Sequence, residues 1–101
     1  MPFVPVAELK NYEGKELGRS EWFTIDQERI NLFAEATGDF QFIHVNPEKA
    51  AKTPFGSTIA HGFLSLSLIP KLMEDLLVVP EGLKMVINNG LDRSEEHTSE
   101  L

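Results

Sequence analysis

Cysteine is absent from this 101-residue sequence, so disulfide bonds and thiolate chemistry are excluded. A chain without thiols fits the reducing environment of the cytoplasm, where we expect the protein to act. The sequence also lacks an apolar run long enough to span a bilayer, and its first residues lack the basic region and apolar core of a secretory signal. We therefore expect no membrane partner.

Basic residues are few. The chain has 9 lysines and arginines against 16 aspartates and glutamates, which gives a net charge of -7. This balance disfavours a nucleic-acid partner, and an anionic ligand would need a local basic patch that the sequence does not obviously provide. With 42% hydrophobic and 25% charged residues, the chain has the composition of an ordinary globular protein of at most one domain.

A first helix is predicted between Asp26 and Gly38. Asp26 can cap its first turn, Glu28 suits the positive end of the helix dipole, and Gly38 can take the left-handed conformation that ends a helix. The apolar face of this helix comprises Ile30, Phe33 and Ala34. Asp39 is therefore expected to lie just beyond the C-terminal end of this helix.

A second, short helical turn is predicted over residues 46–51. Asn46 is a favourable helix cap, and Pro47 suits the first helical position because its missing N–H would have no partner there. Residues 53–56 are rich in turn formers and should return to a loop.

Large apolar residues dominate residues 62–77 and point in every direction around a helix, so we expect one central helix with most of its surface buried. Pro70 should kink it, because proline removes a backbone hydrogen bond. Residues 21–25 and 84–91 are rich in branched and aromatic side chains and predict two strands.

Asp39 and His44 form the most informative pair of side chains. They lie five residues apart, which places them about 140° apart on a helix and on opposite faces of a strand. They can converge only in irregular backbone. Gly38 supplies such backbone immediately before Asp39.

The pair belongs to a longer pattern. His44 follows Asp39 after four intervening residues, Pro47 follows His44 after two, and two further blocks lie at residues 54–56 and 59–63. In these blocks the sequence resembles the MaoC-like (R)-specific enoyl-CoA hydratases, and within them the nodulation-protein-N-like dehydratases, from about residue 6 to residue 91. The resemblance implies an α+β hot-dog fold, in which an antiparallel sheet wraps around one central helix. Because the sequence predicts only two strands, we expect the fold to be incomplete in this chain.

The resemblance also implies a cofactor-free hydratase, or the reverse dehydratase, that acts on an acyl-CoA thioester. Asp39 and His44 would activate a water, which adds to the β carbon of a trans-2-enoyl-CoA. The backbone amide of Gly62 would stabilise the enolate oxygen, since the missing side chain lets the thioester carbonyl approach a helix N-terminus. Substrate contacts are expected from Phe40, Phe55, His61 and Phe63. Full-length members of the family are expected to pair as homodimers.

Each of these residues also has a purely structural interpretation. Asp39 could brace the loop, His44 could be an ordinary loop histidine, and His61 could shape the turn or bond to the backbone. The phenylalanines could belong to the core. A metal site built from Asp39, His44 and His61 is chemically possible, although no paired-histidine or cysteine spacing supports it. Ser65 and Ser67 lack the surroundings of a hydrolase nucleophile.

Two other functions stay open. A hot-dog acyl-CoA thioesterase would direct a carboxylate-activated water at the thioester carbonyl instead of the β carbon, but the motifs of that family do not pair Asp and His in this way. Alternatively, the chain is an inactive fragment or a non-catalytic hot-dog subunit whose catalytic partner is another chain.

Residues 93–101 read like the translation of a widely used sequencing adaptor, whereas the family would continue into a strand. We therefore expect residues 1–92 to be the N-terminal part of a single MaoC-like domain and residues 93–101 to be a non-native tail. The alternative is a natural, solvated charged end. Under the first interpretation His97 takes no part in the site.

Overall fold

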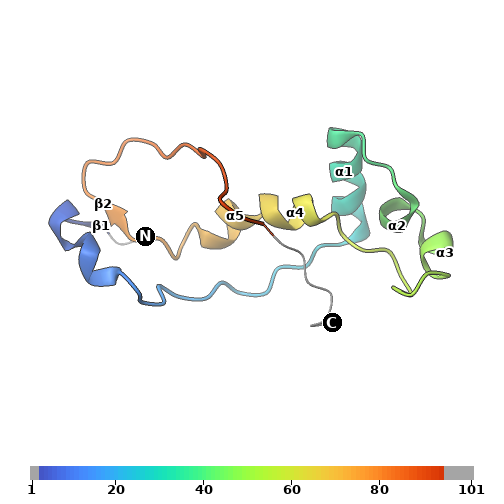
Figure 1. Cartoon of the computed structure of the whole chain (residues 1–101), viewed down its shortest axis with the longest axis horizontal. Coiled ribbons are helices and arrows are strands. Elements are labelled where there is room, and N and C mark those ends of the chain that lie inside the picture. Colours follow the sequence, from blue (N-terminus) through green and yellow to red (C-terminus); the bar gives the residue numbers. More distant parts are fainter. Residues whose placement is uncertain (1–2, 95–101) are drawn as a thin grey trace. The chain divides into compact units, whose positions relative to one another are not determined.

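The computed structural model describes residues 3–94. The expected tail therefore lies almost entirely outside the described residues. The chain divides into two compact units, of which one comprises Glu21–Leu72 and the other combines Met1–Ser20 with Met73–Leu101. Figure 1 follows the elements along the chain from β1 to β2. No helix in the described part of the chain is long and apolar enough to cross a membrane.

The second of these units contains a two-stranded parallel sheet. Strand β1 (Phe3–Val4) pairs with β2 (Val79–Pro80) in the register Phe3 to Val79, and the amide of Glu81 extends the pairing by donating to the carbonyl of Val4 at 2.8 Å. Val4 and Val79 are buried. A 3₁₀ helix, η1 (Val6–Tyr12), follows β1 directly.

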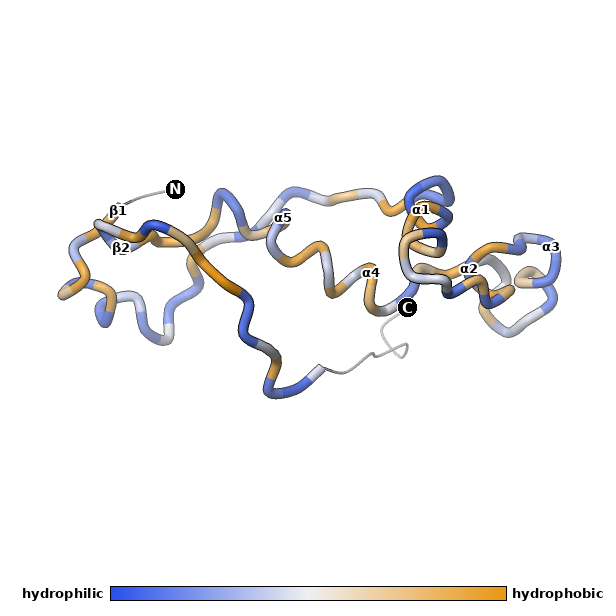
Figure 2. The backbone as a smooth tube through the Cα atoms, turned by 90° about the horizontal axis from the view of Figure 1, so that it is seen from above, coloured by the Kyte–Doolittle hydropathy of each residue, from blue (hydrophilic) through white to orange (hydrophobic). Residues whose placement is uncertain are grey.

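Neither of the two predicted strands forms in the described residues. Residues 21–25 and 84–91 are irregular, and the sheet that does form is parallel, not antiparallel. The physical reason is the lack of a pairing partner, because a segment of high strand propensity still needs a neighbouring strand for its backbone hydrogen bonds. The side chains stay exposed instead, Trp22 fully and Met85, Val86 and Ile87 by 70%, 74% and 75%. Figure 2 shows an apolar stretch of the tube beyond β2.

The first helix forms as predicted. Helix α1 (Gln27–Thr37) is capped by Asp26, whose carboxylate accepts a hydrogen bond from the amide of Arg29 at 2.9 Å. Gly38 ends the helix at φ 80°, a left-handed conformation that glycine adopts without steric cost. Ile30 and Ala34 are buried, so the apolar face faces the core of its unit.

Two single-turn helices follow. Helix α2 (Phe42–Val45) was not predicted, whereas α3 (Pro47–Ala50) confirms the predicted turn. Asn46 joins them, since it ends α2 and its side chain then accepts a hydrogen bond from the amide of Lys49 at 3.1 Å. Helix α2 packs against both α1 and α3, as Figure 1 shows.

The expected central helix is divided. Helix α4 (Gly62–Ser67) has Leu68 as its C-cap, and α5 (Ile69–Met73) begins at the next residue. The disturbance expected from Pro70 takes the form of a break two residues before it instead of a kink, because proline cannot donate the hydrogen bond that would continue α4. The prediction of a mostly buried surface is wrong for this chain: Leu64 is buried, but Phe63 is 73% exposed.

The described residues therefore hold helices and a small sheet, which is α+β only in the coarse sense. An antiparallel sheet around a continuous helix is not present among them. The first unit nevertheless has a local core built from Ile30, Ala34, Ala50 and Leu64. His44 and His61 are buried in the same unit and belong to the candidate site.

Candidate active site

Asp39 directly follows the glycine that ends α1. Its carboxylate oxygen Oδ1 accepts a hydrogen bond from the amide of Gln41 at 3.2 Å, which closes a tight turn ahead of α2. The side chain is exposed. The backbone turn thus sets the direction of a carboxylate that stays accessible to a ligand.

His44 lies on α2 and is only 7% exposed. Its ring nitrogen Nδ1 is 2.8 Å from the carbonyl oxygen of Ile59. A carbonyl can only accept, so Nδ1 carries the hydrogen and Nε2 carries the lone pair. His44 is therefore held in the tautomer in which Nε2 can accept a proton.

The segment before α4 is fastened to α2 by a reciprocal pair of hydrogen bonds. While the carbonyl of Ile59 accepts from His44, the amide of Ile59 donates to the carbonyl of Ile43 at 3.0 Å. This attachment fixes the entry to α4. It brings His61, two residues further on, against the ring of His44.

His61 occupies the N-cap position of α4 and is 3% exposed. Its Nε2 donates to the backbone carbonyl of Asp39 at 3.0 Å, and its ring stacks on that of His44 with 3.9 Å between centroids and 24° between planes. The ring of Phe33 also packs against the ring of His61, with 4.9 Å between centroids. The remaining nitrogen, Nδ1, is buried without a hydrogen-bond partner.

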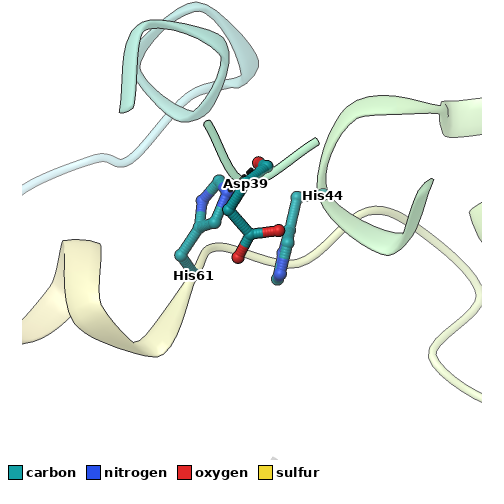
Figure 3. Close-up of side chains that lie close together, drawn as sticks. All are labelled: Asp39, His44 and His61. Carbon is teal, nitrogen blue, oxygen red and sulfur yellow. Dashed lines mark hydrogen bonds between the residues drawn. The ribbon is translucent and has the colours of Figure 1, made fainter. Parts of the chain in front are cut away.

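The structure thus brings three side chains together from three segments, the loop after α1, helix α2 and the start of α4 (Figure 3). Asp39, His44 and His61 can each offer one ligand atom, and these atoms all lie within 4.8 Å of one another. One oxygen atom that hydrogen-bonds to two groups spans about this separation. The arrangement suits a water held between a carboxylate and an imidazole.

The same three residues are the candidates for holding a cation. Carboxylate and imidazole are ligands that zinc accepts. However, Nε2 of His61 and Nδ1 of His44 already donate to backbone carbonyls. A metal would therefore have to use Nε2 of His44, Nδ1 of His61 and the carboxylate of Asp39.

Gly62 is the first residue of α4, where the first amides have no acceptor within the helix. The expected substrate residues Phe40, Phe55 and Phe63 are exposed by 57%, 44% and 73%, so they do not belong to the core of their unit. His61 differs from them because it is buried and bonds to the backbone, as the structural alternative anticipated. Ser67 bonds to the preceding carbonyl of Leu64 at 2.7 Å.

Gln27 supports the site and was missed in the sequence. Its Nε2 donates to the carbonyl of His44 at 2.8 Å and to Asn31 at 2.9 Å, and its Oε1 accepts from the hydroxyl of Thr58 at 2.6 Å. One side chain thus joins α1, α2 and the loop before α4. A glutamine in the first turn of a helix carries no local mark of such a role, so a single sequence could not have revealed it.

Comparison with known proteins identifies the family. The sequence matches the MaoC-like domain over residues 8–92, so the chain belongs to this family, as its motifs predicted. It is 53% identical over 91 residues to 3-hydroxyacyl-thioester dehydratase Z of Mycobacterium tuberculosis, with 90% of this chain and 60% of the relative covered.

Two further relatives agree with this assignment. Nodulation protein N of Rhizobium leguminosarum is 52% identical over 91 residues, covering 89% of this chain and 56% of the relative. The 3-hydroxybutyryl-CoA dehydratase of Methylorubrum extorquens is 35% identical over 79 residues, covering 76% of this chain and 50% of the relative. The chain thus spans between 50% and 60% of the length of these relatives.

Proposed function

We propose that this chain carries the Asp/His site of an (R)-specific enoyl-CoA hydratase, which also runs in reverse as a 3-hydroxyacyl-CoA dehydratase. The observation that carries the proposal is the geometry of Asp39 and His44. His44 presents the lone pair of Nε2, and a ring nitrogen of His44 lies within 4.8 Å of a carboxylate oxygen of Asp39. The names of the relatives support the reaction class, since two of them are dehydratases of 3-hydroxyacyl thioesters.

The proposed mechanism uses one water. Asp39 accepts one hydrogen bond from this water, and Nε2 of His44 removes its other proton as the oxygen attacks the β carbon of the enoyl thioester. The electron pair of the double bond moves to the thioester oxygen, where the amide of Gly62 stabilises the enolate. The proton held by His44 then passes to the α carbon, so that the product gains the hydrogen and hydroxyl of one water.

The fold proposed for the active enzyme is the hot-dog fold, with α4 and α5 as parts of its central helix and residues 1–92 as the first part of one domain. Family membership supports this assignment. So does the exposure of Phe63, Ile69 and Met73, by 73%, 42% and 38%, because a wrapped sheet would bury such side chains. We further propose that the enzyme is a cytoplasmic homodimer.

The test is an assay of crotonyl-CoA with two proteins. One is the 101-residue chain, and the other is a chimaera in which its matching 91 residues replace those of the mycobacterial relative. The chimaera is expected to form 3-hydroxybutyryl-CoA. In the chimaera, Asp39→Asn and His44→Gln should each lower the rate of this reaction by at least about a hundredfold. Asp75→Asn, on an exposed aspartate outside the site, is the matched control.

The products discriminate between the alternatives. Release of free CoA without hydration would indicate a thioesterase. No reaction in the chimaera, although the mycobacterial protein itself is active in the same assay, would indicate a non-catalytic subunit. Hydration that survives both substitutions would refute the assignment of Asp39 and His44.

A further inference from the structure

His61 touches both members of the proposed catalytic pair without being exposed. It donates Nε2–H to the carbonyl of Asp39 at 3.0 Å and stacks on the ring of His44 at 3.9 Å, and it is 3% exposed. We propose that His61 is a positioning residue, which fixes Asp39 and His44 relative to each other and makes no contact with the substrate. Its meaning for catalysis rests on the hydratase function proposed above.

The first half of this role is a hydrogen bond. Because the carbonyl of Asp39 can only accept, His61 carries its hydrogen on Nε2 and the lone pair on Nδ1. The bond holds the backbone of the same residue whose carboxylate is directed by the amide of Gln41. His61 and Gln41 thus fix Asp39 from its main chain and from its side chain.

The second half is the stack. The bond from Nδ1 of His44 to Ile59 selects the tautomer, but one hydrogen bond leaves the imidazole free to tilt about it. A ring stacked at 3.9 Å and 24° limits this tilt. Phe33 packs on the His61 ring at 4.9 Å and so limits its movement in turn. The direction of the lone pair on His44 therefore depends on His61.

Burial separates this role from substrate binding. A ring that is 3% exposed has almost no surface to offer a ligand. One of its nitrogens is committed to the Asp39 carbonyl, and the other is buried without a partner. The role differs from that of Asp39, whose carboxylate is exposed.

Two substitutions separate the hydrogen bond from the stack. His61→Gln keeps an N–H group that can reach the Asp39 carbonyl but removes the ring, whereas His61→Phe keeps a ring but removes the N–H. His97→Gln, at a position outside the described residues, controls for the loss of a histidine elsewhere. The readouts are the ¹⁵N shifts of the imidazoles, which identify the tautomer, and the exchange rate of the Gln41 amide.

In the unsubstituted 101-residue chain we expect hydrogen on Nε2 of His61 and on Nδ1 of His44. His61→Phe should speed exchange of the Gln41 amide by roughly three- to tenfold, the range for loss of one hydrogen bond, and leave the His44 tautomer unchanged. His61→Gln should leave this exchange rate nearly unchanged. It should give mixed tautomers at His44, because an unstacked ring can tilt away from the Ile59 carbonyl and lose the hydrogen bond that selects the tautomer. Unchanged spectra in both variants would overturn the proposal. Hydrogen on Nδ1 of His61 in the unsubstituted chain would also overturn it, and this measurement does not depend on whether a variant folds.

Kinetics in the active protein give a second and separable test. Both variants should lower kcat by roughly tenfold and leave KM unchanged, because His61 acts through other groups. A raised KM with unchanged kcat would assign His61 to substrate binding and refute the positioning role. If no hydration occurs in any form of the protein, the proposed function fails, and the spectra still decide the positioning of Asp39 and His44.

Discussion

Gln27→Leu removes the side chain that joins three segments of the site while keeping a similar volume. Two of its hydrogen bonds are partly buried, those to the His44 carbonyl at 2.8 Å and to the Thr58 hydroxyl at 2.6 Å. The bond to Asn31 is exposed, so water can replace it. At about 1 kcal/mol for each partly buried bond, the free energy of unfolding should fall by about 2 kcal/mol.

Urea unfolding monitored by far-UV circular dichroism measures this loss. For a urea m-value of about 1 to 2 kcal/mol/M, the midpoint should fall by about 1 to 2 M. Asn31→Ala is the matched control, because it deletes only the exposed bond and should cost less than about 0.5 kcal/mol beyond any change in helix propensity. If Gln27→Leu proves no more destabilising than Asn31→Ala, the bonds to His44 and Thr58 contribute nothing, and the reasoning is refuted.

Three further predictions concern the site and the assembly. The kinetic losses of Asp39→Asn and His44→Gln should be strongly non-additive in the double variant, since both residues hold one water, and additive losses would argue against a shared water. Treatment with EDTA should leave the hydration rate unchanged, because the mechanism uses no cation, whereas a loss that Zn²⁺ restores would make Asp39, His44 and His61 a metal centre. Sedimentation of the active chimaera should give a dimer, because pairing covers sheet edges, and a fully active monomer would contradict this.

The elements that the sequence predicts correctly depend on contacts between near neighbours. Asp26 and Asn46 cap their helices through amides three residues further on, and Gly38 ends α1 by its own backbone conformation. These interactions need no distant partner, so their residue types are sufficient. The effect of Pro70 on the central segment is local in the same way, although it gives a break where a kink was expected.

The predictions that failed depend on distant partners. Residues 21–25 and 84–91 have the composition of strands, but strand formation requires a second strand at the right distance, which the described chain does not supply. The contact of His61 with His44 was not predictable for a related reason. It arises because Ile59 attaches one loop to α2, and nothing in the local sequence marks that attachment.

Trp22 has an optical consequence. It is the single tryptophan of the sequence, and its side chain is fully exposed. An indole in water emits at long wavelengths, and its emission moves to shorter wavelengths when apolar groups cover it. Any subunit or added segment that packs over Trp22 would therefore shift its fluorescence emission to shorter wavelengths. Assembly could then be followed by titration without a label.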